Sequence, residues 1–319
     1  MHVLIIGAAG MIGRKLTEQL IADGSLHGSA ISKLTLFDWV APERPQTSIE
    51  VVTHTGDLSV AGQTDTLVAD KPEFIFHLAA IVSGEAEMEF DKGYNINLDG
   101  TRALLESIRA QSYMPRLVFT SSIAVFGAPF PDAIYDEFHH TPLTSYGVQK
   151  ACSELMLMDY TRKGFLDGIG IRLPTIVIRP GKPNLAASGF FSNILREPLA
   201  GLPAVLPVSP DVSHWMASPR AAVGFLIHAA GLDADTVGPR RNLTMPGIHA
   251  SISEMIEALG RVAGQNAVDL ISHEPDEMII SIVANWPRNF DPARATALGF
   301  KADSSIDAVI QVHIDDENM

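Results

Sequence analysis

Cysteine is almost absent from this sequence of 319 residues, which contains only Cys152. One thiol cannot form an internal disulfide, and a chain of this length buries a core large enough to fold without one. Such cysteine usage is typical of a reducing cytosol. Long apolar runs are missing as well: no stretch approaches the roughly 20 residues that span a bilayer. Since MHVLII ends at Gly7 with no basic region before it, unlike a signal peptide, we expect a cytoplasmic protein.

Positive charge is also scarce. The sequence has 23 Lys and Arg against 37 Asp and Glu, a formal net charge of −14. An acidic surface repels the phosphates of nucleic acids and anionic lipids, so neither a nucleic acid nor a membrane is expected as a partner. The 11 histidines are scattered and no HExxH motif occurs, so no metal site is expected.

The first half alternates short apolar runs rich in β-branched residues with longer helical patterns, which is typical of a parallel sheet with crossover helices. Strands that are apolar almost throughout indicate a sheet covered on both faces. The predicted strands are 2–6, 33–38, 49–54, 73–78, 116–121 and 168–173. The predicted helices are 11–23, 61–70, 94–112 and 145–163.

From about residue 174 onward the pattern changes, because prolines become frequent and the predicted helices become shorter. Candidate helices lie at 189–197, 218–230, 252–263 and 305–313. We therefore expect a nucleotide-binding core over 1–173. Residues 174–319 are expected to form a smaller substrate-binding lobe, partly interleaved with the last elements of the core.

Three glycines, Gly7, Gly10 and Gly13, lie between the first predicted strand and the first predicted helix, in LIIGAAGMIG. Glycine at such a turn permits positive φ and lets a pyrophosphate approach the backbone. The helix that begins near Met11 and Ile12 points its free N–H groups at the phosphates. The glycine spacing between a strand and a helix predicts a dinucleotide site.

Asp38 ends the second predicted strand, where a carboxylate accepts hydrogen bonds from the adenosine ribose and repels a 2′-phosphate. The nearest arginine after it is Arg44, so the pattern predicts NAD rather than NADP. His77 is interpreted as a core histidine. The other expected cofactor contacts come from later segments: Asp57, Leu58, Leu78, Ala79, Ala80, Asn97, Ser121, Tyr146, Lys150 and Pro174.

Tyr146 and Lys150 lie four residues apart in SYGVQK, so both project from one face of the predicted helix. A phenol is a poor base at neutral pH, because its usual pKa is about 10. An ammonium beside it favours the phenolate and is expected to lower that pKa. The pair could then take a proton from a substrate hydroxyl while a hydride leaves for the nicotinamide.

Two further segments add polar residues to this pair. Ser121 and Ser122 end a predicted strand, at the edge where open α/β sheets bind ligands. We expect Ser122 to orient the substrate oxygen towards Tyr146. Asn97, in NINLDGT, is expected to hold a water or a backbone group that positions Lys150.

The order of these motifs resembles the extended short-chain dehydrogenases/reductases, which include the NAD-dependent epimerases and dehydratases. The features that carry the resemblance are the glycine loop, the acidic end of the second strand, HLAA, NLDGT, TSSIAVFG, Tyr-x-x-x-Lys and FDPARATALGF. The resemblance implies an α/β fold, a Rossmann-type doubly wound parallel sheet with a smaller C-terminal α/β substrate lobe. It also implies NAD as cofactor, the catalytic set Ser122, Tyr146 and Lys150, and a homodimer packed through the two long helices.

Basic residues in the stretch 173–198 bear on the substrate: Arg179, Lys182 and Arg196. An arginine fork matches a carboxylate bidentately, so Arg179 and Arg196 are expected to hold a small, anionic, hydroxylated molecule. A structural salt bridge is the alternative for each arginine. The other expected substrate contacts are Ser83, Ser122, Tyr146, Thr175, Ser188, Gly189 and Phe190.

The stretch 173–198 and the overall length are similar to the D-erythronate dehydrogenase group of this family. That resemblance implies NAD-dependent oxidation of the C2 hydroxyl of a four-carbon sugar acid, with Tyr146 removing the hydroxyl proton. Nucleotide-sugar members usually carry an aspartate where this sequence has Ser218. The alternatives are a nucleotide-sugar 4-epimerase or dehydratase, and a non-catalytic NAD-binding protein, which the Tyr146–Lys150 pair disfavours.

Overall fold

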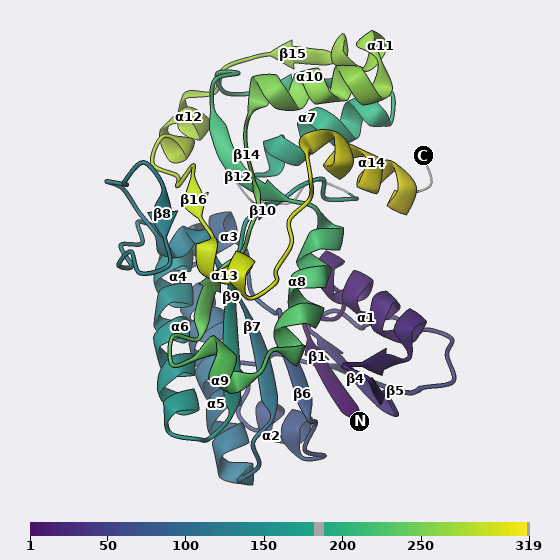
Figure 1. The fold of residues 1–319 in the computed structure, drawn as a ribbon, viewed down its shortest axis with the longest axis vertical. Helices are drawn as coiled ribbons and strands as arrows, with labels where there is room; N and C mark the ends of the chain where they lie inside the picture. Colours follow the sequence, from purple (N-terminus) through teal and green to yellow (C-terminus); the bar gives the residue numbers. More distant parts are fainter. Residues whose placement is uncertain (182–187, 318–319) are drawn as a thin grey trace.

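A parallel sheet of seven strands forms the centre of the computed structural model, which describes residues 1–181 and 188–317 (Figure 1). The strands lie in the order β13-β9-β7-β6-β1-β4-β5, and every neighbouring pair is parallel. Their bounds are β1 His2–Ile6, β4 Lys33–Asp38, β5 Glu50–Thr55, β6 Phe74–His77, β7 Arg116–Ser122, β9 Asp167–Leu173 and β13 Asn242–Thr244. This is the doubly wound Rossmann-type sheet that the sequence predicts.

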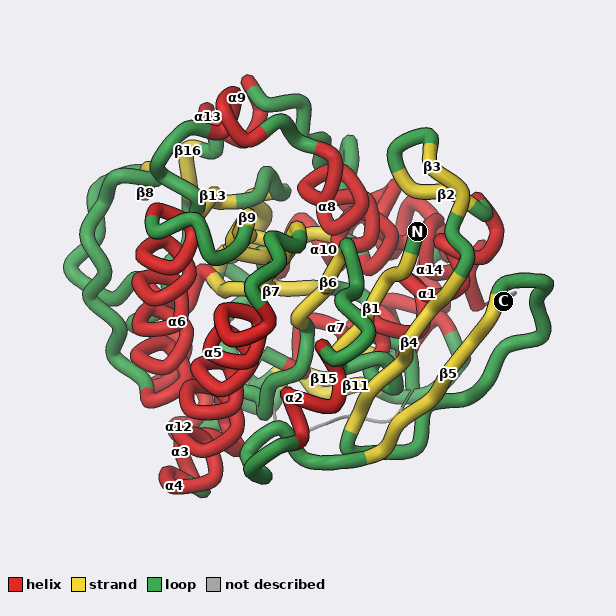
Figure 2. The backbone as a smooth tube through the Cα atoms, turned by 90° about the horizontal axis from the view of Figure 1, so that it is seen from below, coloured by secondary structure: helices red, strands yellow, loops and turns green. Residues whose placement is uncertain are grey.

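Helices cover both faces of this sheet (Figure 2). Helices α1 (Met11–Asp23) and α8 (Pro219–Gly231) pack together on one face. On the other face lie α2 (Gln63–Val68), α5 (Gly100–Gln111) and α6 (Ser145–Arg162). Alternate residues of β1 serve the two cores: Val3 and Ile5 pack on the side of α1, Leu4 and Ile6 on the side of α5. The strand is apolar throughout because both of its faces are buried.

The second part of the chain builds a lobe at the carboxyl edge of the sheet, at the top of Figure 1. A small sheet joins β10 (Thr175–Ile176), β12 (Ser213–Ala217) and β14 (Ile248–Ser251). The other elements are α7 Gly189–Leu199, β11 Ala204–Leu206, α10 Ile252–Ala263, β15 Ile271–His273, α12 Glu277–Val283 and α14 Ile306–Glu317. They share a separate apolar core that contains Phe191, Met216 and Leu259.

Most predicted elements agree with the structure to within a few residues, and two differences are informative. The predicted helix 94–112 begins as a π-helix over Tyr94–Asp99 and becomes α-helical only in α5. Strand β13 was not predicted, because its three residues are too short to show a pattern. Since β13 and α8 both follow residue 173 and pack with the sheet, the core draws on chain from both sides of the proposed boundary. Among the described residues, no helix has the length and apolarity required to cross a membrane.

Close packing around two glycines sets the junction between β1 and α1. Gly7 has φ of +95°, and a Cβ there would lie 2.7 Å from the backbone nitrogen of Ala79. A Cβ on Gly13 would lie 2.1 Å from the carbonyl oxygen of Gly7. Backbone occupies the space at both positions, so any side chain would push the helix away from the strand.

We expect Gly13→Ala to lower the free energy of unfolding by about 2 kcal/mol, since the added methyl overpacks a rigid backbone contact. Gly224→Ala is the matched control, because Gly224 lies in α8 with no atom within 4 Å of its Cβ position. That change should raise stability by up to about 1 kcal/mol through helix propensity. Urea unfolding of both variants measures the difference, and equal stabilities would contradict the packing argument.

Candidate active site

A cleft of about 720 Å³ lies between the carboxyl edge of the sheet and the lobe. Ligands bind at this edge in open α/β sheets, where loops and helix N-termini converge. Most of the residues predicted from the sequence line it: Gly7, Gly10, Met11, Ile12, Gly13, Leu78, Ala80, Ser83, Ser121, Ser122, Tyr146, Lys150, Pro174, Thr175, Arg179, Ser188, Gly189 and Arg196. Six predicted residues are not part of the lining: Asp38, Asp57, Leu58, Ala79, Asn97 and Phe190.

The glycine loop has the features that a dinucleotide pyrophosphate needs. Helix α1 has no side-chain cap at Gly10 and no acidic residue in its first turn, so its first N–H groups are left for a ligand. Gly10 is exposed at the cleft, and a Cβ there would take space on the ligand side. The Asp38 carboxylate lies beside the loop, because its Oδ2 accepts a hydrogen bond of 2.9 Å from the Ala9 N–H. These residues fit the phosphates and the ribose of NAD.

Three of the expected cofactor contacts, Asp57, Leu58 and Ala79, lie outside the cleft lining. The Leu58 side chain is buried in the core and packs against Gly100 of α5. Asp57 Oδ1 accepts hydrogen bonds from the backbone and side chain of Ser59, both of 2.8 Å. Ala79 is bound through its backbone N–H to the Ile6 carbonyl. Leu58 therefore presents backbone rather than its side chain to any ligand.

Tyr146 and Lys150 project from the first turns of α6, which the side chain of Thr144 caps by accepting from Gly147 N. Lys150 is 2% exposed, and its Nζ donates a hydrogen bond of 2.7 Å to the carbonyl oxygen of Thr120 on β7. The same Nζ lies 5.7 Å from the centroid of the Tyr146 ring. The pair therefore shares one face of the helix, with the ammonium held by the end of the neighbouring strand.

Burial dominates the protonation of both residues. It raises the pKa of Tyr146 to about 12, although a hydrogen bond with Ser122 and the charge of Arg179 act in the opposite direction. Burial also lowers the pKa of Lys150 to about 7, against the attraction of Glu154. The expectation that Lys150 lowers the pKa of Tyr146 below its usual value is therefore wrong for this structure. The groups that favour the phenolate are Ser122 and Arg179.

The two serines at the end of β7 point to opposite sides, as successive residues of a strand do. Ser121 is buried, and its Oγ donates a hydrogen bond of 2.5 Å to Glu154 Oε1, behind the cleft. Ser122 is half-buried, lines the cleft together with Tyr146 and acts to lower the pKa of that phenol. This arrangement favours Ser122 over Ser121 as the serine that meets a substrate oxygen.

Asn97 lies in the π-helix, buried and away from the cleft lining. Its Oδ1 accepts from the backbone N–H of Ile81, and its Nδ2 donates to the Ile81 carbonyl and to Gln149 Oε1. The amide has no hydrogen bond with Lys150, whose partner is the Thr120 carbonyl. Asn97 thus holds a backbone group, that of Ile81, beside the cleft, but the carbonyl that binds Lys150 is that of Thr120.

The two arginines expected to bind the substrate differ in whether a carboxylate of the protein already pairs with them. Arg179 donates to the Ile176 carbonyl and to Ser188 Oγ, and no carboxylate in the described part of the chain pairs with it. Burial lowers its pKa, while Tyr146 acts to raise it. Arg196 is instead paired with Glu197 and also donates to the Arg179 carbonyl, so the salt-bridge alternative holds for it.

Phe190 and Lys182 do not add to the site. The Phe190 side chain faces the core of the lobe and packs against Phe191 at 4.2 Å between ring centroids, because α7 turns its apolar face inward. Lys182 lies outside the residues that the structure describes. Ser218 caps α8 and donates a hydrogen bond of 2.7 Å to Asp303.

His214 is a cleft residue that the sequence analysis did not identify. Its Nε2 lies 2.7 Å from Thr175 Oγ1, and its ring stacks on Phe191. Burial lowers its pKa to about 3, so the ring is neutral at physiological pH. The only available signal was a histidine in the apolar run SHWMA, which is more often a core residue.

Comparison with known proteins agrees with the fold and the site. Residues 3–213 match the model of the NAD dependent epimerase/dehydratase family. The chain is 45% identical to a D-erythronate dehydrogenase from Cupriavidus necator, covering 100% of this chain and 99% of the relative. It is 42% identical to a D-erythronate dehydrogenase from Haemophilus influenzae, covering 99% of each.

A solved structure described as the nucleoside-diphosphate-sugar epimerase from Agrobacterium tumefaciens is 62% identical, with a TM-score of 0.98. The match covers 100% of this chain and 94% of that one. A family match over more than half of the chain agrees with the uncapped glycine loop and the adjacent Asp38, and with NAD as the cofactor. The chain belongs to the NAD-dependent epimerase/dehydratase family.

Proposed function

We propose that this protein oxidises the C2 hydroxyl of a small sugar acid, D-erythronate, to the 2-oxo acid with NAD. We infer an acid as the substrate class from Arg179. Its guanidinium lies in the cleft and has no carboxylate partner among the described residues. Two relatives named D-erythronate dehydrogenase, each matched over nearly its full length, support the choice of acid.

Three polar residues of the cleft have a direct place in this reaction: Tyr146, Ser122 and Arg179. Bound NAD supplies the acceptor for the hydride that leaves C2. After losing its own proton, Tyr146 takes the proton of the C2 hydroxyl as the phenolate, so the carbonyl forms as the O–H and C–H bonds break. Ser122 hydrogen-bonds the same oxygen and holds it towards Tyr146. Arg179 favours loss of the Tyr146 proton through its charge, since it lowers the pKa of that phenol.

Arg179 also supplies the carboxylate contact. Its Nε and Nη2 are held by the Ile176 carbonyl and Ser188 Oγ, which orient the guanidinium within the cleft. A carboxylate placed against this partly buried group gains charge-assisted hydrogen bonds. The acid would then lie with its first carbon at Arg179 and its second near Tyr146 and Ser122.

A nucleotide-sugar 4-epimerase or dehydratase is the second candidate, favoured by the description of the 62% identical Agrobacterium tumefaciens structure. A pyrophosphate carries at least two negative charges and is usually bound by several cations. In the described part of the cleft, Arg196 is neutralised by Glu197, which leaves Arg179 and the buried Lys150. One accessible guanidinium matches a single carboxylate better than a diphosphate.

The first experiment separates the two candidates by following reduced nicotinamide. Four- to six-carbon sugar acids are offered with NAD or NADP, and nucleotide sugars are offered in parallel. We expect net NADH with D-erythronate and little turnover with NADP, because Asp38 lies beside the glycine loop. Conversion of a nucleotide sugar without net NADH, and no oxidation of any acid, would reject the proposal.

We expect Tyr146→Phe to lower kcat by at least about 100-fold, the usual contribution of a general base. Tyr160→Phe is the matched control, because Tyr160 lies on the same helix and contacts Glu106 outside the cleft. It should retain the activity of the parent protein. An active Tyr146→Phe variant would remove this residue from the mechanism.

We expect Arg179→Met to lower kcat/KM for the acid about 10- to 100-fold, the value of a charge-assisted contact. The matching uncharged sugar amide should lose much less, since it has no carboxylate to bind. Arg196→Met, the control, should chiefly lower the temperature of unfolding, because it leaves Glu197 unpaired. Equal losses on the acid and the amide would assign Arg179 a role in the fold alone.

A further inference from the structure

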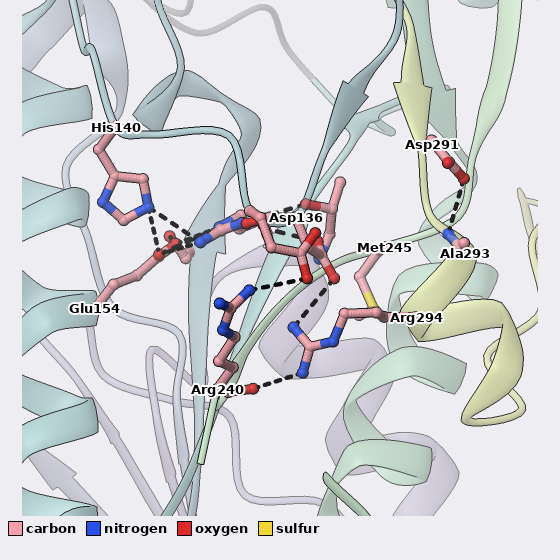
Figure 3. A network of polar contacts seen from close by, with 12 residues as sticks. Asp136, His140, Glu154, Arg240, Met245, Asp291, Ala293 and Arg294 are labelled. Atoms are coloured by element: carbon pink, nitrogen blue, oxygen red, sulfur yellow. Dashed lines mark hydrogen bonds and ion pairs between the residues drawn. The ribbon is translucent and has the colours of Figure 1, made fainter. Parts of the chain in front are cut away.

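Directly behind the cleft, a chain of buried charges alternates in sign. Glu154 of α6 is fully buried, and its Oε2 lies 2.8 Å from Arg172 Nη2 on β9. Arg172 also pairs with Asp136 at 3.8 Å, and Asp136 pairs with Arg294 at 3.4 Å. In Figure 3, Glu154 and His140 lie on one side of this network, and Asp136 and Arg294 on the other. None of these residues takes part directly in the proposed reaction.

Glu154 stands one helical turn after Lys150, so the carboxylate and the ammonium project from the same buried face of α6. Both groups are bound to consecutive residues of β7. Lys150 Nζ donates to the Thr120 carbonyl, and Glu154 Oε1 accepts from Ser121 Oγ. The end of one strand therefore holds the two charges at neighbouring positions.

Arg172 and His140 keep the Glu154 carboxylate in its charged form. Burial alone would neutralise this carboxyl, but the charge and hydrogen bonds of Arg172, together with a hydrogen bond from His140, lower its pKa to about 2. A fixed anion in a region without water acts strongly on nearby charges. Lys150 is a buried cation one helical turn before Glu154, and it has no ion-pair partner within 4 Å in the described chain.

We propose that Glu154 is a positioning residue that keeps Lys150 in its charged form at the Thr120 carbonyl beside Tyr146. The proposal rests on the proposed role of Tyr146 as the base, since Lys150 lies beside its ring in the same cleft. Without the carboxylate, burial would favour loss of the Lys150 proton, and the cleft would lose a positive charge that lies 5.7 Å from the centroid of the Tyr146 ring. Arg172 serves the same end indirectly, since it keeps Glu154 ionised.

The other titratable groups around Lys150 do not offer this charge. Tyr146, on the same helix, is a neutral phenol at physiological pH because burial raises its pKa. His77, at the end of β6, is neutral because burial lowers its pKa to about 3. Arg172, on β9, is a cation and so offers Lys150 no negative charge. Glu154 is the group whose charge favours the ammonium.

The test is a titration of the lysine side chains by ¹⁵N NMR in the full-length protein without substrate. The sequence has eight lysines, and Lys150→Arg assigns the signal. We expect Glu154→Gln to move the titration midpoint of Lys150 to lower pH by roughly one unit, as loss of a neighbouring opposite charge does. Glu154→Asp, which retains the charge, should restore most of the shift.

Asp136→Asn is the matched control, because Asp136 is a buried carboxylate on the same arginine, at the far end of the network. It should lower stability without moving the Lys150 midpoint. If Glu154→Gln does not fold, Glu154→Gln with Arg172→Met removes the buried pair as a unit, and Lys150 should still titrate below its midpoint in the parent protein.

A Lys150 midpoint that is the same in the parent, Glu154→Gln and Asp136→Asn proteins would overturn the proposal and leave Glu154 with a structural role. The alkaline midpoint of the kcat/KM profile should move with the NMR midpoint in the Glu154→Gln variant. Because the titration needs no substrate, a failure of D-erythronate turnover would not be confused with a failure of this inference.

Discussion

Contact between backbone atoms at the start of α1 is the constraint on which the rest of the site depends. Gly13 stands against the Gly7 carbonyl, and Gly7 against the backbone of Ala79, so β1, α1 and the end of β6 meet without intervening side chains. This contact brings the uncapped turn of α1 to the sheet edge where β7 and β9 also end. The position of the cofactor loop at this edge is therefore set by contacts between backbone atoms.

Electrostatic compensation divides the basic residues of the site into two kinds. Arg172 and Arg196 have carboxylate partners and hold elements together. Lys150 and Arg179 are bound only by uncharged oxygens in the described chain, and both line the cleft. The chain as a whole has a formal net charge of −14, so most of its surface repels anions. The two basic side chains without carboxylate partners make the cleft more favourable to an anion than the remaining surface.

The sequence predicted well what depends on local pattern and poorly what depends on side-chain direction. The family, the Rossmann-type sheet and NAD were correct, because apolar strands and glycines at turns carry strong local signals. Arg196 was harder to place, since its partner is the adjacent Glu197, and neighbouring residues on a helix do not usually face one another. Phe190 turns into the lobe, and Asn97 away from the cleft, because tertiary packing decides which face of a helix is buried.

Completion of the sheet by β13 has a consequence for how the protein is made. The strand pairs with β9 but is separated from it by almost 70 residues, most of them in the lobe and α8. During synthesis the outer edge of β9 stays bare, with its backbone groups open to pairing with other chains, until residue 244 has left the ribosome. The nucleotide-binding half thus cannot complete its sheet until much of the second half has been synthesised. The folding of the first half therefore depends on the synthesis of the second.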